Sequence, residues 1–88
     1  MEFEYDPAKS ASNKLKHGID FEDGKALWDD PMALEAPLRY EAEERFAVIG
    51  MIGSKHWTAI ATRRGDAVRI ISLRRSHPNE ERAYDEEV

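Results

Sequence analysis

The sequence predicts an α+β domain in which helices pack on an antiparallel β-sheet. Three observations lead to this class. Before Pro31 the apolar residues recur with the period of a helix, after Pro31 they follow the pattern of strands joined by tight turns, and a polar segment rich in glutamate follows Pro78. A chain of 88 residues has room for one such unit, so we expect a single domain over residues 1–88.

The first expected elements are a short strand and a helix. Residues 3–5 (FEY) suit an edge strand, and Asp6 followed by Pro7 is typical of a helix N-cap and the first helical position. Gly18 stands where a left-handed residue commonly ends a helix. The side of this helix that faces the core is predicted to be the apolar stripe of Ala8, Ala11 and Leu15.

A second helix is expected over residues 20–28. Asp20 is a suitable N-cap, and residues 29–31 (DDP) would end the helix. Gly24 lies inside it and lowers its stability by about 1 kcal/mol relative to alanine. The side chains predicted to point inward are those of Phe21, Leu27 and Trp28.

Strands are predicted in the second half of the chain. Residues 32–36 form a short strand, which Pro37 confines to a sheet edge. Residues 45–52 (RFAVIGMI) are apolar on both alternating sets, as in a central strand covered on both faces. Tight turns lead into two further strands at residues 56–63 and 68–75, which gives an antiparallel meander.

The last strand carries arginines on both of its faces. Strict alternation predicts one face with Val68, Ile70, Ser72 and Arg74, and the other with Arg69, Ile71, Leu73 and Arg75. Whichever face is buried, an arginine lies on the open face at the C-terminal end of the strand. A polar C-terminal helix is expected to follow from Pro78, with Glu80 and Glu81 in its first turn.

Charge is segregated along the chain. Residues 1–44 carry 5 basic and 12 acidic side chains, residues 45–79 carry 7 and 1, and residues 80–88 carry 1 and 5. The basic side chains of the middle segment are mostly arginines, namely Arg45, Arg63, Arg64, Arg69, Arg74 and Arg75. Because arginine binds phosphate oxygens in a fork, this cluster predicts a phosphate-rich ligand.

Several other classes of protein are excluded. The chain has no cysteine, and His17, His56 and His77 are too far apart in sequence for a local metal-binding motif, so neither a metal nor any other cofactor is expected. Glycine-rich nucleotide-binding loops are absent. The N-terminus does not resemble a signal peptide and no long apolar run occurs, so we expect a cytoplasmic protein without a membrane partner.

If the ligand is RNA, cleavage without a metal needs a base near the 2′-hydroxyl, cations around the phosphorus and an acid for the leaving oxygen. His17 and His77 are candidates for proton transfer, although each more often serves as a capping or packing residue. Glu43 and Glu44 are each a candidate base or a partner for arginine. Trp57 and Tyr84 are candidates to stack on a base, although a strand tryptophan more often lies in the core.

Several segments together resemble the BrnT family of toxins from type II toxin–antitoxin systems. They are the acidic N-terminal strand, KHGIDFEDG at 16–24, DDP at 29–31, EERFAVIG at 43–50 and RIISLRRSHPNEERAYDE at 69–86. The resemblance implies a RelE-like fold and an RNA-cleaving activity that halts translation. It also implies neutralisation by a BrnA-type antitoxin with a ribbon-helix-helix DNA-binding part, so that operator DNA is bound only through the complex.

The resemblance also implies site residues. The family pattern falls on Lys16, His17, Glu44, Arg45, Arg69, Ser72, Arg74, Glu81, Arg82 and Tyr84. Together with the arginine analysis, it predicts a catalytic group of Lys16, His17, Glu44, Arg45, Arg74 and Tyr84. The predicted substrate-binding group consists of Arg63, Arg69, Arg75 and Trp57.

Two alternatives remain at this point. The chain is either an active ribonuclease or a toxin-like binding module without catalysis that serves only as antitoxin partner and co-repressor. Direct DNA binding by the chain alone is a third possibility, which its acidic ends weaken.

Overall fold

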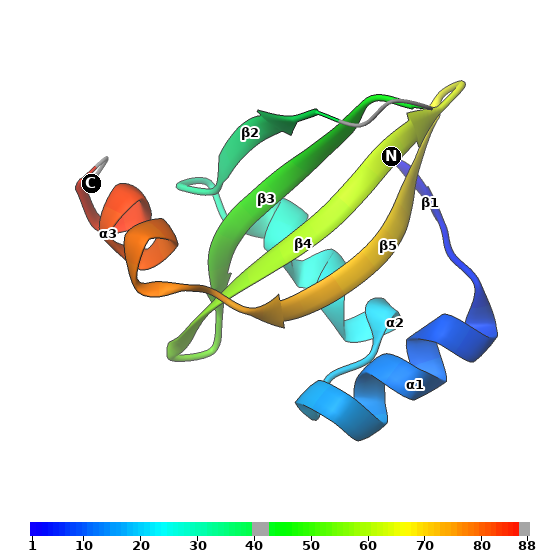
Figure 1. The fold of residues 1–88 in the computed structure, drawn as a ribbon, viewed down its shortest axis with the longest axis horizontal. Coiled ribbons are helices and arrows are strands. Elements are labelled where there is room, and N and C mark those ends of the chain that lie inside the picture. Colours follow the sequence, from blue (N-terminus) through cyan, green and yellow to red (C-terminus); the bar gives the residue numbers. More distant parts are fainter. Residues whose placement is uncertain (40–42, 87–88) are drawn as a thin grey trace.

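A computed structural model describes residues 1–39 and 43–86 (Figure 1). Its five-stranded sheet has the order β1-β5-β4-β3-β2. The strands are β1 (Glu2–Glu4), β2 (Leu34–Leu38), β3 (Arg45–Ile52), β4 (Lys55–Arg64) and β5 (Ala67–Arg75). The helices are α1 (Pro7–His17), α2 (Phe21–Gly24), its 3-10 continuation η1 (Lys25–Asp29) and α3 (Pro78–Glu86). The predicted α+β class is confirmed.

The sheet is mixed, which corrects the prediction of a wholly antiparallel sheet. Strands β2 to β5 do pair antiparallel with their neighbours in sequence. β1, however, pairs parallel with β5, with Phe3 opposite Val68. The chain leaves β1 through helices rather than through a hairpin, and such a connection permits parallel pairing. Pro37 lies in the edge strand β2, where its missing N–H breaks no pairing with a further strand.

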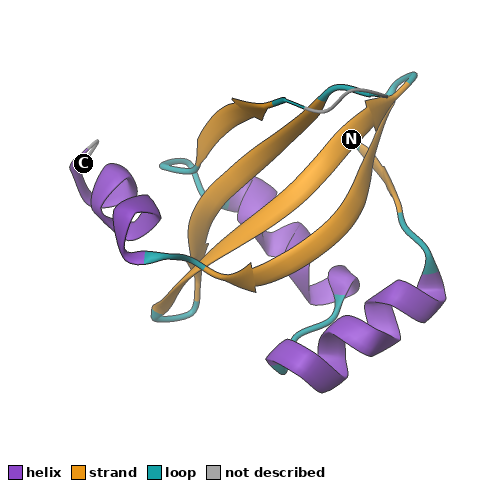
Figure 2. Ribbon diagram, viewed as in Figure 1, coloured by secondary structure: helices purple, strands orange, loops and turns teal. Residues whose placement is uncertain are grey.

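Helices lie on both sides of the sheet, so the predicted packing of two helices on a sheet is only part of the architecture. α1, α2 and η1 cover one side, the helical face (Figure 2). The other side, the open face, carries Ala47, Ile49, Thr58, Thr62, Arg69 and Arg74, and α3 covers one end of it. The core fills the helical face and consists of Ile19, Phe21, Leu27, Phe46, Val48, Trp57, Ala59, Ala61, Val68, Ile70 and Leu73.

A β-bulge in β5 changes the predicted alternation of its side chains. Ile60 is opposite Ser72 while the next residue, Ala61, is opposite Ile70, so Ile71 is an extra residue. After the bulge, each residue of β5 lies on the face opposite to the one that strict alternation predicts relative to the residues before it. Arg69, Ser72 and Arg74 therefore share the open face, whereas Val68, Ile70, Leu73 and Arg75 share the helical face. The strict alternation expected from the sequence is wrong beyond Ile71.

α1 is capped as predicted, but the face of the helix that packs on the protein is opposite to the predicted one. Asp6 accepts hydrogen bonds at its N-terminus and Gly18, with φ of 81°, ends it. The predicted inward stripe is exposed, and the buried residues are Ser10 and Asn13. Ser10 Oγ accepts from Phe21 N (2.9 Å), and the Asn13 amide donates to Ile19 O (2.8 Å) and accepts from Leu73 N (3.3 Å). Polar side chains point inward because buried backbone groups need these partners.

The second predicted helix is divided at Gly24 into α2 and η1, with Asp20 as the N-cap. A Cβ atom at Gly24 would lie 2.7 Å from Leu73 Cδ2, so the close packing of α2 on β5 explains a glycine inside a helix. Phe21 and Leu27 are buried as predicted. Trp28 is only partly buried, packed edge-on against Phe3 with 5.1 Å between ring centroids.

Asn13→Ala is expected to lower the free energy of unfolding by about 2 kcal/mol, because Ile19 O and Leu73 N lose a buried partner. Leu15→Ala on the same helix is the matched control. Its side chain is 90% exposed, so we expect a change within about 0.5 kcal/mol. Urea denaturation of both variants checks this. A larger loss in Leu15→Ala than in Asn13→Ala would show that α1 packs by its apolar stripe after all.

Candidate functional site

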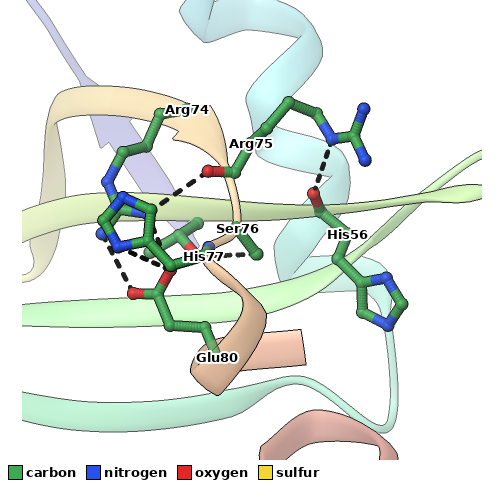
Figure 3. A network of polar contacts seen from close by, with 7 residues as sticks. His56, Arg74, Arg75, Ser76, His77 and Glu80 are labelled. Atoms are coloured by element: carbon green, nitrogen blue, oxygen red, sulfur yellow. Dashed lines mark hydrogen bonds and ion pairs between the residues drawn. The ribbon is translucent and has the colours of Figure 1, made fainter. Parts of the chain in front are cut away.

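A dense network of polar contacts lies on the open face, where β5 ends and α3 begins (Figure 3). Arg74 comes from β5 and Thr58 from the neighbouring β4, directly opposite it in the register. Ser76 and His77 form the link to α3, and Glu80 comes from the first turn of α3. Three segments of chain thus meet around one arginine.

Arg74 is held by Glu80 in a bidentate ion pair. Its Nη1 lies 2.7 Å from Glu80 Oε1 and its Nη2 lies 2.9 Å from Glu80 Oε2. Nη1 also donates to Arg75 O (3.3 Å). The Arg74 side chain is 26% exposed and that of Glu80 15% exposed, so the pair is partly shielded from water and its geometry is well defined.

Glu80 accepts further hydrogen bonds that stabilise its charge. The backbone N–H of His77 donates to Oε1 (2.7 Å), as does Thr58 Oγ1 (3.2 Å). Hydrogen bonds from Arg74, aided by those from His77 and Thr58, outweigh burial and lower the pKa of Glu80 from 4.5 to about 2. The carboxylate is therefore ionised at neutral pH and offsets the charge of Arg74.

The local sequence explains this arrangement. Pro78 begins α3 and is suited to the first helical position. Two residues later, Glu80 reaches back to the N–H of His77, as the glutamate of a capping box does. The link is fixed to the sheet because Ser76 N donates to His56 O (3.1 Å) and Ser76 Oγ lies 2.8 Å from Thr58 Oγ1.

Two histidines near the cluster have different surroundings. The side chain of His77 is 62% exposed, and its Nδ1 lies 3.8 Å from Glu80 Oε1, beside Arg74 (Figure 3). The side chain of His56 is only 17% exposed. Its Nε2 lies 2.9 Å from Asp85 Oδ1, and its ring packs edge-on against Tyr84 at 5.3 Å between centroids. His56 thus joins α3 to the sheet, whereas His77 is accessible to a ligand.

Tyr84, a predicted catalytic residue, is buried at the junction of α3 with the loop after η1. Its hydroxyl donates to Asp30 Oδ2 (2.8 Å), and this bond, together with burial, raises the pKa of Tyr84. Burial of Asp30 acts against its charge, but hydrogen bonds from Met51 N, Met32 N and Tyr84 lower its pKa overall. Tyr84 thereby anchors α3.

Two more predicted arginines lie on the open face. Arg69 shares this face with Arg74 because of the bulge, and its Nη1 lies 3.4 Å from Glu4 Oε1. Arg45, opposite Thr62 in the register, lies at the far end of the same face, with its Nε 3.0 Å from Glu43 Oε1. Glu44 is exposed, and its backbone oxygen accepts from Thr62 Oγ1 (2.6 Å).

The other predicted residues lie on the helical face or beyond it. Arg63 stacks on the Phe46 ring at 4.2 Å from its centroid and pairs with Glu35 (2.6 Å), and Arg75 lies 5.6 Å from the centroid of the buried Trp57 ring. These three predicted substrate-binding residues are not brought together with Arg74. Lys16 and His17 end α1, which packs on the helical face, and both are exposed.

Glu80 was predicted in the first turn of the C-terminal helix but not as a site residue, and neither Thr58 nor His56 was predicted as one. A signal for Glu80 was present, since a glutamate in the first turn after His77-Pro78 matches a capping box. Thr58 and His56 carried no local signal. Their proximity to α3 depends on the register of β4 and β5 and on where the chain re-enters the sheet.

The described residues lack the features of a metal site and of a membrane-spanning helix. Among residues 1–39 and 43–86, no three histidine, aspartate or glutamate side chains are grouped so as to hold a metal ion. The helices of that same part of the chain are all too short or too polar to cross a membrane.

Arg45, Arg69 and Arg74 lie on the open face, and Arg74 holds two carboxylate oxygens of Glu80 in a fork. A guanidinium binds phosphate oxygens in the same geometry. A family model described as the ribonuclease toxin BrnT of type II toxin–antitoxin systems matches residues 5–80. The chain therefore belongs to the BrnT family of ribonuclease toxins, as the motifs in the sequence indicated. Comparison with individual curated proteins found no match.

Glu80→Gln is expected to lower the free energy of unfolding at neutral pH, by at most about 3 kcal/mol. A carboxylate with a lowered pKa contributes fully above its ordinary value of 4.5, and the contribution is lost as the pH falls through about 2. The difference between the variant and the unmodified protein should therefore shrink on acidification from about pH 5 to pH 2.

Urea denaturation across this pH range provides the measurement. Glu86→Gln, an exposed glutamate on the same helix, is the control and should show no such trend. A difference for Glu80→Gln that stays constant with pH would contradict the role given to its charge.

Proposed function

We propose that the chain is an endoribonuclease toxin whose RNA-binding site is the open face around Arg74. The observation that carries the proposal is the fork that Arg74 makes with two carboxylate oxygens at a partly exposed position. The same fork fits two phosphate oxygens. An RNA phosphate would take the place of the Glu80 carboxylate, and membership of a ribonuclease toxin family supports RNA as the substrate.

The proposed reaction is an attack of the 2′-hydroxyl on the adjacent phosphorus, without a metal or other cofactor. A base removes the proton of the 2′-hydroxyl, the 5′-oxygen leaves with a proton from an acid, and a cyclic phosphate remains. Arg74 stabilises the negative charge of the phosphorane. His77 is the proton-transfer group, because its imidazole is exposed beside the Arg74–Glu80 pair.

Further arginines of the open face extend this site. Arg69 and Arg45 would bind neighbouring phosphates along the strand of RNA. The assignments of Lys16, His17, Glu44 and Tyr84 to catalysis, and of Arg63, Arg75 and Trp57 to substrate binding, stay predictions. In the structure, Arg74 donates hydrogen bonds to the Glu80 carboxylate and to the backbone oxygen of Arg75.

We also propose the wider setting that family membership supports. In a RelE-like toxin of this family, RNA cleavage would halt translation in the cytoplasm until a BrnA-type antitoxin binds. The ribbon-helix-helix part of that antitoxin would carry the complex to operator DNA. The acidic side chains of α3 complement a basic surface on such a partner.

A second candidate function is a binding module without catalysis. The observation in its favour is that Glu80 already neutralises Arg74 in the absence of RNA. Expression without the antitoxin separates the two, because growth arrest with RNA cleavage requires an active enzyme.

Arg74→Gln is expected to lower the rate of RNA cleavage by on the order of 10²–10³, through loss of a donor to the phosphorane. A single-turnover assay with purified protein in EDTA measures this rate and tests metal independence as well. The double variant Arg74→Gln with Glu80→Gln avoids leaving a half-buried unpaired carboxylate and should show the same loss. Arg63→Gln, on the helical face, is the comparison, because Arg63 was predicted to bind substrate. An unchanged rate in Arg74→Gln would remove Arg74 from its role.

His77→Ala is expected to lower cleavage by about 10²–10⁴, the usual contribution of a general acid or base. The variant should also lose one limb of the pH–rate profile of kcat. His17→Ala is the informative comparison, because the sequence favours His17 and the geometry favours His77. Unchanged cleavage in His77→Ala together with a loss in His17→Ala would move proton transfer to the end of α1.

A further inference from the structure

α1 presents an apolar ridge to the solvent. Ala8, Ala11 and Leu15 recur at the spacing of one helix face, yet all three are exposed, and Leu15 is 90% exposed. The opposite side of the helix makes the contacts with the rest of the protein through Ser10 and Asn13. Within residues 1–39 and 43–86, the core therefore does not cover this apolar stripe.

Lysines flank the ridge on both sides. With 100° per residue, Lys14 lies on one side of the Ala8–Ala11–Leu15 line, and Lys9 and Lys16 lie on the other. α1 contains no acidic residue. A shallow hollow of about 570 Å³ adjoins the ridge and is lined by Tyr5, Pro7, Ser10, Ala11, Lys14, Leu15 and Asp20. Lys14 Nζ lies 3.9 Å from Asp23 Oδ2, but both side chains are more than half exposed. The surface thus combines an apolar centre, exposed lysines on both flanks and a recess for a side chain.

We propose that this ridge is the surface on which the protein antitoxin docks, through an amphipathic segment with an apolar centre and carboxylates on both sides. The apolar residues of that segment would cover Ala11 and Leu15 and enter the hollow, while its carboxylates would pair with the lysines. The proposal rests on the toxin–antitoxin class of the chain and not on the mechanism of RNA cleavage.

Other occupants fit the ridge less well. RNA gains little from aliphatic side chains, since it binds through phosphate contacts and stacking on aromatic rings. A membrane needs a larger apolar area than one leucine and two alanines offer. In a symmetric pair of two copies of this chain, the lysine rows would face each other and repel. A partner with carboxylates matches both the apolar centre and the charge.

The test uses the full chain and the purified antitoxin encoded in the neighbouring reading frame, with Kd measured by titration calorimetry. Leu15→Glu is expected to raise Kd at least about tenfold, because it places a charge in the apolar centre. Lys14→Glu should also raise Kd and reduce its dependence on salt. Met32→Glu, a second exposed apolar residue (38% exposed), is the matched control and should leave Kd unchanged.

Two further readouts keep this test separate from that of RNA cleavage. Leu15→Glu should unfold at the same urea concentration as the unmodified protein and cleave RNA at the same rate, yet resist neutralisation by the antitoxin. An unchanged Kd in Leu15→Glu overturns the proposal. It is overturned equally if Leu15→Glu weakens RNA binding alone, which would make the ridge an RNA contact, or if it only converts a dimer of the chain into a monomer.

Discussion

One extra residue in β5 determines how the two faces of the sheet are used. Without Ile71 as a bulge, Arg69 and Arg74 would point to opposite sides, and Leu73 could not join Ile70 in the core. The bulge places Arg69 and Arg74 on the open face while Ile70 and Leu73 lie on the helical face. Because a small domain has only one core, β5 has to supply apolar side chains to that core and arginines to the opposite face at the same time.

The Arg74–Glu80 pair joins this sheet to the last helix. Arg74 is partly buried and needs a counter-charge, and Glu80 supplies it while also capping α3. The same contact that positions the guanidinium also neutralises it. In the proposed function, an RNA phosphate would therefore have to compete with an internal carboxylate. Further polar contacts join α3 to the rest of the fold, namely His56 of β4 with Asp85, and Asp30 of the loop after η1 with Tyr84.

α1 shows where sequence periodicity and packing diverge. Its apolar stripe predicted a core-facing helix, but the buried backbone groups Phe21 N, Ile19 O and Leu73 N are satisfied by Ser10 and Asn13. An amphipathic pattern indicates that one face of a helix is apolar. It does not indicate whether the same chain or another molecule covers that face. For this toxin, the proposed cover of the exposed apolar face is the protein antitoxin.

The sequence by itself determined the types and order of the elements, the caps at Asp6 and Gly18, the edge position of Pro37 and the family, because these depend on local signals. The sequence also determined that an arginine side chain lies on the open face at the C-terminal end of β5. Only the tertiary structure decided that Arg69 joins Arg74, that Arg63 and Arg75 do not, and that Glu80 and His77 surround the site. Those placements depend on the bulge, the strand register and the docking of α3, which involve residues far apart in the chain.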